Sequence, residues 1–419
     1  MRRALVLLGG LPLIGGCSLV RAEGPVPPAP PTIAVSPAFD TDQARPDRGL
    51  VVKASGGKLG KVDAYAGAVA IPGRYDSTGT VWRSSWTLPP GVEHTVTATA
   101  AGPQGGPTTL AMGRFRTRAA QRTFKVASVS PLPGETVGVG TPIIVTFDNP
   151  IRHKAAVERA MEVRSTKPVE GAWRWTSDTE AVYRTRHYWP ARQNVSFTAH
   201  LSGVRAAPGV YGTADHALTF TIGRRQTSSV DTVTHQMVVR RDGAIVQTMA
   251  ISAGMATTRE YTTTSGIHLT MEKGDPVRMI SPGRRKGDPG FYDLLIDHAV
   301  RISNSGEYVH AKNNVWAQGR VNVSHGCVNA RPDQAAWFYD NSLRGDPVTI
   351  VGTDRVLEWN NGWGYWQLPW DKWVQGSALY DPRPSDVWVA TKPLHTPCRE
   401  SIPIPVAAGT AKWVIRGLP

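Results

Sequence analysis

Short stretches in which apolar and polar residues alternate constrain the fold of this chain more than any other feature. Two of them, "HTVTATA" (94–100) and "NVSFTAHL" (194–201), have the period of two that places apolar side chains on one face of a β-strand. Gly and Pro are frequent, with 42 and 33 in 419 residues, and segments with helical periodicity are nearly absent. The sequence therefore predicts a mainly β protein.

The pattern occurs twice with similar spacing. A Trp-bearing strand precedes each alternating stretch, "TVWRSSWTL" (80–88) in the first copy and "GAWRWTS" (171–177) in the second. Short strands and Gly/Pro turns over about 90 residues are typical of an immunoglobulin-like β-sandwich. We predict one such module over 38–120 and another over 121–225, although a single large β domain would also fit.

The next region, 226–352, has a different pattern. Asp242-Gly243 lies between two alternating strands, which is a strong hairpin signal. Further strands are expected at 265–273, 276–281, 291–297, 307–312 and 346–352. "RPDQAAWFYDNSL" (331–343) predicts a short helix with Pro332 in its first turn. We predict a mainly antiparallel β domain, and a Trp- and Pro-rich C-terminal extension over 353–419 that packs on it.

The N-terminus predicts export. Residues 1–16 contain two arginines and an apolar run too short to span a bilayer, as in a signal peptide. Ile14-Gly15-Gly16-Cys17 resembles a bacterial lipobox, which would make Cys17 the lipidated first residue, and residues 17–37 form a Pro-rich tether. We expect a protein held by this lipid at the outer face of the cytoplasmic membrane and reaching into the cell wall. A plain secretory signal cleaved elsewhere is the alternative.

The net charge of +14 favours anionic partners such as nucleic acid, lipid headgroups or acidic wall polymers. The basic residues are scattered, and the clusters are as short as Arg284-Arg285-Lys286. No nucleic-acid motif is visible in the sequence, so we expect no nucleic-acid partner. A solvated basic surface explains the charge equally well.

Cysteine is scarce, with three in the chain, and Cys327 lies two residues after His325 in "VNVSHGCVNA" (321–330). A thiol needs a nearby base or cation to act as a nucleophile. His325 would share a strand face with it, and His310, upstream, could be returned to it by a strand and a loop. Gly326 would free the N–H groups of 326 and 327 to form an oxyanion hole.

Cys327 could instead be a metal ligand or a structural residue. Zinc would find three ligands at best in Cys327, His310 and His325, without the regular spacing of zinc sites. A buried structural cysteine packed against histidines would also fit, and a disulfide with Cys398 is conceivable in an exported protein. We expect no metal and two free thiols.

"SHGCVN" (324–329), with a histidine upstream, resembles the signature of the L,D-transpeptidases of the YkuD type. The resemblance extends through "GFYDLLIDHAVRISNSGEYVHA" (290–311), "AAWFYDNSLRGDPV" (335–348) and "GYWQLPWDKW" (364–373). Two immunoglobulin-like modules behind a lipobox are similar to the actinobacterial, mycobacterial-type members. One departure is the segment between His310 and Ser324, which is about one residue shorter than usual and contains Trp316.

The resemblance implies roles for individual residues. It makes Cys327 the nucleophile and His310 the general base and acid, with the imidazole oriented by the backbone carbonyl of Ala311. His325 would support the thiol, and Tyr292 would line the site and assist the oxyanion hole. Four further residues match positions that line the substrate cleft: Ser305, Gly306, Ser324 and Asn329. Tyr292 as a core aromatic, Asn329 as a cap, and Ser305 and Gly306 as turn residues are the alternatives.

The resemblance also implies the reaction. Cys327 would attack the carbonyl between meso-diaminopimelate and D-Ala in a peptidoglycan tetrapeptide stem, release D-Ala, and transfer the acyl group to the amine of an acceptor stem as a 3→3 cross-link. No cofactor is expected, and carbapenem-type β-lactams would acylate the same thiol. An L,D-carboxypeptidase, attachment of a protein to peptidoglycan, and a wall-binding scaffold without activity are the alternatives.

Overall fold

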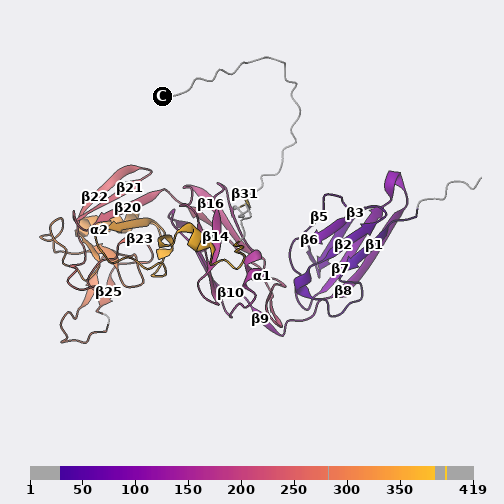
Figure 1. Ribbon diagram of the computed structural model, residues 1–419, viewed down its shortest axis with the longest axis horizontal. Coiled ribbons are helices and arrows are strands. Elements are labelled where there is room, and N and C mark those ends of the chain that lie inside the picture. The colour runs from indigo at the N-terminus through magenta and orange to yellow at the C-terminus, as the bar shows by residue number, and fades with distance from the viewer. Residues whose placement is uncertain (1–28, 282, 383–391, 394–419) are drawn as a thin grey trace, which may run out of the picture. The chain divides into compact units, whose positions relative to one another are not determined.

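The computed structural model describes residues 29–281, 283–382 and 392–393 and divides the chain into two compact units. One unit extends to Trp86 and includes Gly91–Arg118, and the other contains Thr87–Pro90 and the chain from Ala119 onward. The mainly β fold is confirmed (Figure 1). Residues 1–16, which we predicted to be a signal peptide, lie outside the described residues, as do Cys17 and Cys398.

The first unit is a sandwich of two four-stranded sheets with the strand orders β1-β2-β6-β5 and β4-β3-β7-β8. In β7, "EHTVTATAA", His94, Val96, Ala98 and Ala100 are buried in alternation, as the period of two requires. The strand β1 begins inside the range that we assigned to the tether, because "TIAVS" itself alternates and pairs with β2. The elements are β1 (Thr32–Ser36), η1 (Pro46–Arg48), β2 (Val51–Ser55), β3 (Lys58–Ala66), β4 (Val69–Ala70), β5 (Gly73–Tyr75), β6 (Val81–Ser84), β7 (Glu93–Ala101), η2 (Pro103–Gly105) and β8 (Thr108–Arg116).

The second unit begins with another sandwich, whose sheets have the orders β10-β12-β15-β14 and β11-β19-β16-β13-β31, beside a small sheet β17-β18-β9. Its core is continuous and aromatic, with Trp173, Trp189, Phe197 and Phe220 all buried. The elements are β9 (Arg122–Phe124), β10 (Val126–Ser130), β11 (Thr136–Val137), β12 (Ile143–Phe147), α1 (Lys154–Arg159), β13 (Met161–Ser165), β14 (Gly171–Trp175), β15 (Glu180–Thr185), β16 (Gln193–Ala199), β17 (Arg205–Ala207), β18 (Val210–Gly212), β19 (His216–Ile222) and β31 (Lys392–Pro393).

The remainder of this unit is built on a nine-stranded sheet of order β23-β30-β20-β21-β22-β29-β28-β27-β24. It is mainly antiparallel, as expected, but β20 with β30 and β28 with β29 are parallel pairs. The predicted helix forms with Pro332 at its start. The elements are β20 (Gln226–Asp231), β21 (Gln236–Arg241), β22 (Ala244–Ser252), β23 (Gly266–Leu269), β24 (Lys273–Gly274), β25 (Val277–Ile280), β26 (Asp293–Ile296), β27 (Ala299–Arg301), β28 (Tyr308–Ala311), β29 (Val328–Ala330), α2 (Pro332–Asn341) and β30 (Pro347–Val351).

The described part of the C-terminal extension contains η3 (Gly364–Gln367) and α3 (Trp370–Val374). It packs on Leu269 and Met271 next to the nine-stranded sheet, and also on Ala172 and Val182 of the second sandwich. The extension therefore shares one apolar core with both neighbours rather than with the nine-stranded sheet alone.

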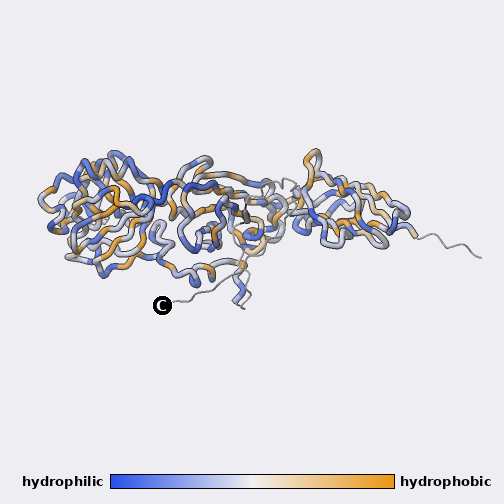
Figure 2. The backbone as a smooth tube through the Cα atoms, turned by 90° about the horizontal axis from the view of Figure 1, so that it is seen from above, coloured by the Kyte–Doolittle hydropathy of each residue, from blue (hydrophilic) through white to orange (hydrophobic). Residues whose placement is uncertain are grey.

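Hydropathy changes over short distances along the tube of Figure 2, as expected for strands with one buried face. Among the residues with described structure, no helix is both long and apolar enough to cross a membrane.

Candidate active site

Cys327 lies in the turn that leads into β29 and opens into a cavity of about 190 Å³. The predicted residues Tyr292, His310, Ser324, His325, Cys327 and Asn329 all line it. The other lining residues were not predicted from the sequence: Met279, Leu294, Ile296, Lys312, Asn314 and Val323. Most of the residues that we predicted to lie around Cys327 therefore do line one cavity, although they come from separate segments of the chain.

The parallel pair β28–β29 explains why His310 and Cys327 meet. In this ladder His310 is aligned with Asn329, and Val309 with Val328. Both valines are fully buried in the core beneath the sheet. Since successive side chains on a strand alternate between faces, His310, Asn329 and Cys327 lie on the opposite face, which borders the cavity. Two strands that are distant in the sequence therefore bring the thiol and the imidazole to one surface.

His310 is set up as a neutral base. Its side chain is buried, and Nδ1 lies 2.9 Å from the carbonyl oxygen of Ala311. A carbonyl oxygen can only accept, so Nδ1 carries the proton and Nε2 is left as the acceptor. Burial lowers the pKa of His310 to about 4; the bond to Ala311 opposes this decrease in part, and the charge of Lys312 adds to it. The predicted pairing of His310 with Ala311 is present in the structure.

The Cys327 thiol is also neutral. Burial raises its pKa to about 12, opposed in part by a hydrogen bond from the backbone of Tyr308. The thiol donates to the carbonyl oxygen of Gly306, with 3.6 Å between Sγ and O. A resting thiolate–imidazolium pair is therefore disfavoured, and the proton must move to His310 as the sulfur attacks.

The predicted oxyanion role of the Gly326 N–H does not fit this conformation. That N–H donates to Oγ of Ser324 at 3.1 Å, and the same hydroxyl donates to the carbonyl of Cys327 at 2.6 Å. Gly326 has φ of +125°, which a side chain would disfavour. Gly326 and Ser324 thus shape the turn that presents the thiol, while Tyr292 supplies a hydroxyl in the cavity wall. Burial raises the pKa of Tyr292 and keeps it a donor at neutral pH.

His325 is stacked between two tyrosines. Its ring lies 4.3 Å from that of Tyr261 and 5.3 Å from that of Tyr292, at angles of 27° and 24°. Burial and the charge of Arg284 both lower its pKa. Arg284 in turn forms a two-fold ion pair with Glu260, with separations of 2.7 and 2.9 Å. His325 thus lines the cavity near the thiol, and its predicted role as a support for the thiol rather than as the base stays a prediction.

Ser305 and Gly306 are exposed and are not among the residues that line this cavity. Asn361 of the C-terminal extension makes two hydrogen bonds to Ser305: its Oδ1 accepts from the Ser305 N–H at 3.0 Å, and its Nδ2 donates to the Ser305 hydroxyl at 2.9 Å. The carbonyl of Gly306 contacts Cys327 from this loop. Of these two residues, Gly306 contacts the thiol, and Ser305 is held by Asn361 in the same loop; their predicted place in the substrate cleft stays a prediction.

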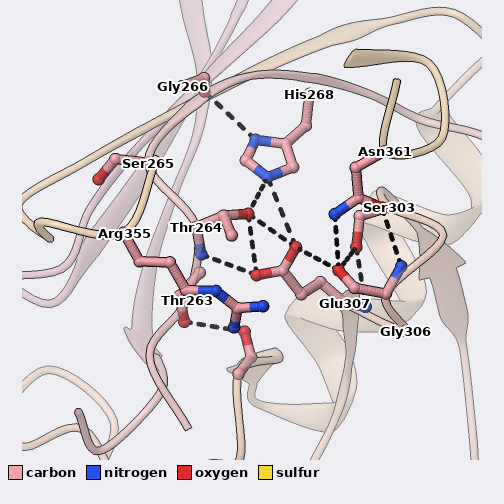
Figure 3. A network of polar contacts seen from close by, with 12 residues as sticks. Thr263, Thr264, Ser265, Gly266, His268, Ser303, Gly306, Glu307, Arg355 and Asn361 are labelled. Atoms are coloured by element: carbon pink, nitrogen blue, oxygen red, sulfur yellow. Dashed lines mark hydrogen bonds and ion pairs between the residues drawn. The ribbon is translucent and has the colours of Figure 1, made fainter. Parts of the chain in front are cut away.

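A buried polar cluster under this loop was not foreseen from the sequence. Glu307 accepts from the backbone N–H of Thr264 at 2.7 Å and from its hydroxyl at 2.8 and 2.9 Å (Figure 3). His268, fully buried, lies 3.7 Å from the same carboxylate. Burial alone would raise the pKa of Glu307, but the hydrogen bond and charge of His268, with the Thr264 bond, lower it to about 2. No periodic or spacing signal marks such a pair in advance.

Glu307→Ala should lower the free energy of unfolding by about 3 kcal/mol, because it leaves the Thr264 N–H buried without its acceptor and removes the carboxylate that pairs with the buried His268. The pKa of Glu307 is lower in the folded chain than its usual 4.5, so its stabilisation is present above about pH 4.5 and is lost as the pH falls towards 2. Urea unfolding at neutral pH and near pH 3 measures both effects. Glu272→Ala, at an exposed carboxylate, is the matched control. A loss below about 1 kcal/mol would contradict the prediction.

The opposite wall of the cavity is an apolar hairpin. Among the described strands, β25 and β26 pair only with each other, and their register aligns Met279 with Leu294 and Val277 with Ile296. In the part of the chain with described side chains, no group of three or more His, Cys, Asp or Glu could hold a metal ion. The cavity thus combines an apolar wall with a polar wall that carries the thiol and its base.

The chain matches known protein families and curated relatives. Residues 225–350 match the family described as "L,D-transpeptidase catalytic domain", and residues 41–205 match "Bacterial Ig domain". L,D-transpeptidase 5 of Mycobacterium tuberculosis is 34% identical over 365 residues, which cover 85% of this chain and 79% of that protein. L,D-transpeptidase 2 of the same species is 35% identical over 320 residues, 74% of this chain and 75% of that protein.

Solved structures are also similar. The crystal structure of L,D-transpeptidase 3 from Mycobacterium tuberculosis in complex with a faropenem-derived adduct is 31% identical, with a TM-score of 0.45. The similarity covers 54% of this chain and 98% of that chain.

Proposed function

The chain belongs to the L,D-transpeptidase family, and we propose that it forms 3→3 cross-links in peptidoglycan through an acyl-enzyme on Cys327. The observation that carries this proposal is the neutral imidazole of His310, whose Nδ1 is held by Ala311 and whose Nε2 is free to accept a proton on the face that bears Cys327. A thiol, a base and an acceptor that orients the base, on neighbouring strands, support this proposal.

The first half-reaction forms a thioester. The sulfur of Cys327 attacks the carbonyl carbon between diaminopimelate and D-Ala, and its proton passes to His310. The Tyr292 hydroxyl donates to the oxyanion that develops. His310 then protonates the departing amine, the C–N bond breaks, and D-Ala leaves. Separation of the charges occurs only during attack, since both partners are neutral at rest.

The second half-reaction regenerates the thiol. The side-chain amine of an acceptor stem attacks the thioester while His310 removes its proton, and the proton returns to the sulfur as the C–S bond breaks. With water as acceptor the same steps would give an L,D-carboxypeptidase. The strained carbonyl of a carbapenem-type β-lactam is open to the same attack, so we expect stable acylation of Cys327 by such compounds.

Mass spectrometry of the protein incubated with purified disaccharide-tetrapeptides tests the proposal, with Cys327→Ala as the matched control. Loss of D-Ala with a dimer joined 3→3 is the expected result. Loss of D-Ala without a dimer, at high acceptor concentration, would show that the protein is an L,D-carboxypeptidase and not a transpeptidase. If D-Ala is not released and a carbapenem does not acylate the protein, the remaining interpretation is a wall-binding scaffold without activity.

The rate of D-Ala release should be nearly constant from about pH 5 to about pH 9. The pKa of His310 is lowered to about 4, so this base is already deprotonated at pH 5, where an ordinary histidine is mostly charged. The pKa of Cys327 is raised to about 12, so no increase from thiolate formation occurs near pH 8.5. The profile of kcat/KM measures this, and a half-maximal rate near pH 6.5 would show that the pKa of His310 is not depressed.

We also propose that the protein is exported and anchored through a lipid on Cys17, since Cys17 ends an apolar segment with two arginines before it and a Pro-rich tether after it. A Cys17→Ala variant should move from the membrane fraction to the soluble fraction of cells. An unchanged distribution would favour a secretory signal without lipidation.

A further inference from the structure

Lys312 is the one residue with a permanent charge among those that line the cavity. It follows His310 by two positions, so the period of two of an extended chain directs it to the same side. Its backbone N–H donates to the carbonyl of Ala330 at 2.9 Å, which continues the β28–β29 ladder by one residue and holds this orientation. The side chain is half-buried.

Within the described ranges, no carboxylate lies within 4 Å of the Lys312 ammonium group. The carboxylates near the site are already paired: Glu307 with His268 and Thr264, and Glu260 with Arg284. A lysine that lines a partly apolar cavity and has no carboxylate partner favours an anion in that cavity. The site is therefore complementary to a negatively charged group of the substrate.

We propose that Lys312 binds the terminal carboxylate of the donor stem, which belongs to the departing D-Ala. This inference rests on the proposed function. The amine that leaves must lie at Nε2 of His310, and the carboxylate is attached to the same carbon atom as that amine. Lys312 lies about 6.6 Å further along the chain, and its four-carbon stem allows the ammonium group to reach back over this distance.

The charge of Lys312 has a second consequence. In the free protein it lowers the pKa of His310. A carboxylate bound to the ammonium group would cancel much of this effect, so His310 becomes a stronger base when a donor with a free terminus is present. Donor recognition and base strength are thereby coupled through one side chain.

The test compares three donors: the tetrapeptide stem, the same stem ending in D-alaninamide, and the stem with the diaminopimelate side-chain carboxylate amidated. Release of the terminal residue is measured for the wild type, Lys312→Met and Lys312→Arg, with Lys53→Met on an exposed strand position as the control. In the wild type, kcat/KM should be at least about tenfold lower for the alaninamide donor and unchanged for the side-chain amide. Lys312→Met should lose this discrimination, and Lys312→Arg should retain most of it.

Several results would overturn the inference. One is a decrease in kcat/KM of Lys312→Met by the same factor with all three donors. Another is a Lys312→Met variant whose kcat/KM is still lower for the alaninamide donor than for the tetrapeptide stem. If kcat/KM of the wild type were lower only for the donor with the amidated diaminopimelate side chain, Lys312 would instead bind the diaminopimelate carboxylate. If the wild type releases nothing from any donor, the proposed function fails, and calorimetric binding of the same donors to Cys327→Ala still tests Lys312. Equal affinity for the free and amidated termini in that background would then contradict the inference.

Discussion

Cys327→Ala should abolish release of D-Ala from tetrapeptide stems, with a decrease in rate on the order of 10⁴-fold or more. The thiol supplies the electron pair that forms the acyl-enzyme, and the alanine methyl group has no chemistry to replace it. Intact-mass measurement should also show no adduct with a carbapenem. The fold should persist, because Cys327 lies partly buried in a turn and is absent from the buried apolar core below the sheet.

Cys398→Ala makes the same substitution at another cysteine and should leave D-Ala release unchanged. Near-identical circular dichroism spectra of the two variants would show that the loss is chemical. Residual release by Cys327→Ala above about one per cent of the wild-type rate would mean that another nucleophile, or an activated water, carries the reaction.

Trp373→Ala should lower the free energy of unfolding of the second unit by about 4 kcal/mol, through loss of a buried indole and the cavity that it leaves. The Trp373 Nε1–H donates to the carbonyl of Ala172 at 3.0 Å. The Arg184 guanidinium, also buried, lies 4.8 Å from the centre of the Trp373 ring and donates to Leu368 at 2.7 Å. Removing the indole takes away the ring on which the buried Arg184 guanidinium packs, which adds to the loss of stability.

Urea unfolding followed by far-ultraviolet circular dichroism measures this loss. Trp316→Ala is the matched control, since the Trp316 side chain is 62% exposed and should contribute within about 0.5 kcal/mol. A loss below about 1 kcal/mol for Trp373→Ala would show that the extension does not stabilise the sandwich and the nine-stranded sheet together.

Much of the fold was predictable because strands leave a local trace. The alternation in 94–100 predicts β7, and Asp242-Gly243 joins β21 to β22 as expected. Pro332 begins α2. These features depend on neighbouring residues, so the sequence contains them directly. The two parallel pairs in the sheet were not predicted, because their partners are separated by long connections.

The candidate site divides in the same way. The signature around Cys327 and the upstream His310 indicate the nucleophile and its base, and the Ala311 carbonyl is adjacent to His310. The engagement of the Gly326 N–H by Ser324 was missed, because a free N–H was inferred from the small size of glycine alone. The actual partner depends on the conformation of the whole turn.

By itself, the amino-acid sequence determined which chemical groups are present, which faces of the strands are apolar and where the nucleophile lies. Only the tertiary structure decided which distant groups meet: Glu307 with His268, Asn361 with Ser305, and Arg184 with a carbonyl 184 residues away. It also decided the pKa values of His310 and Cys327. The physical reason is that burial and electrostatic partners come from segments remote in sequence, and no local pattern records their proximity.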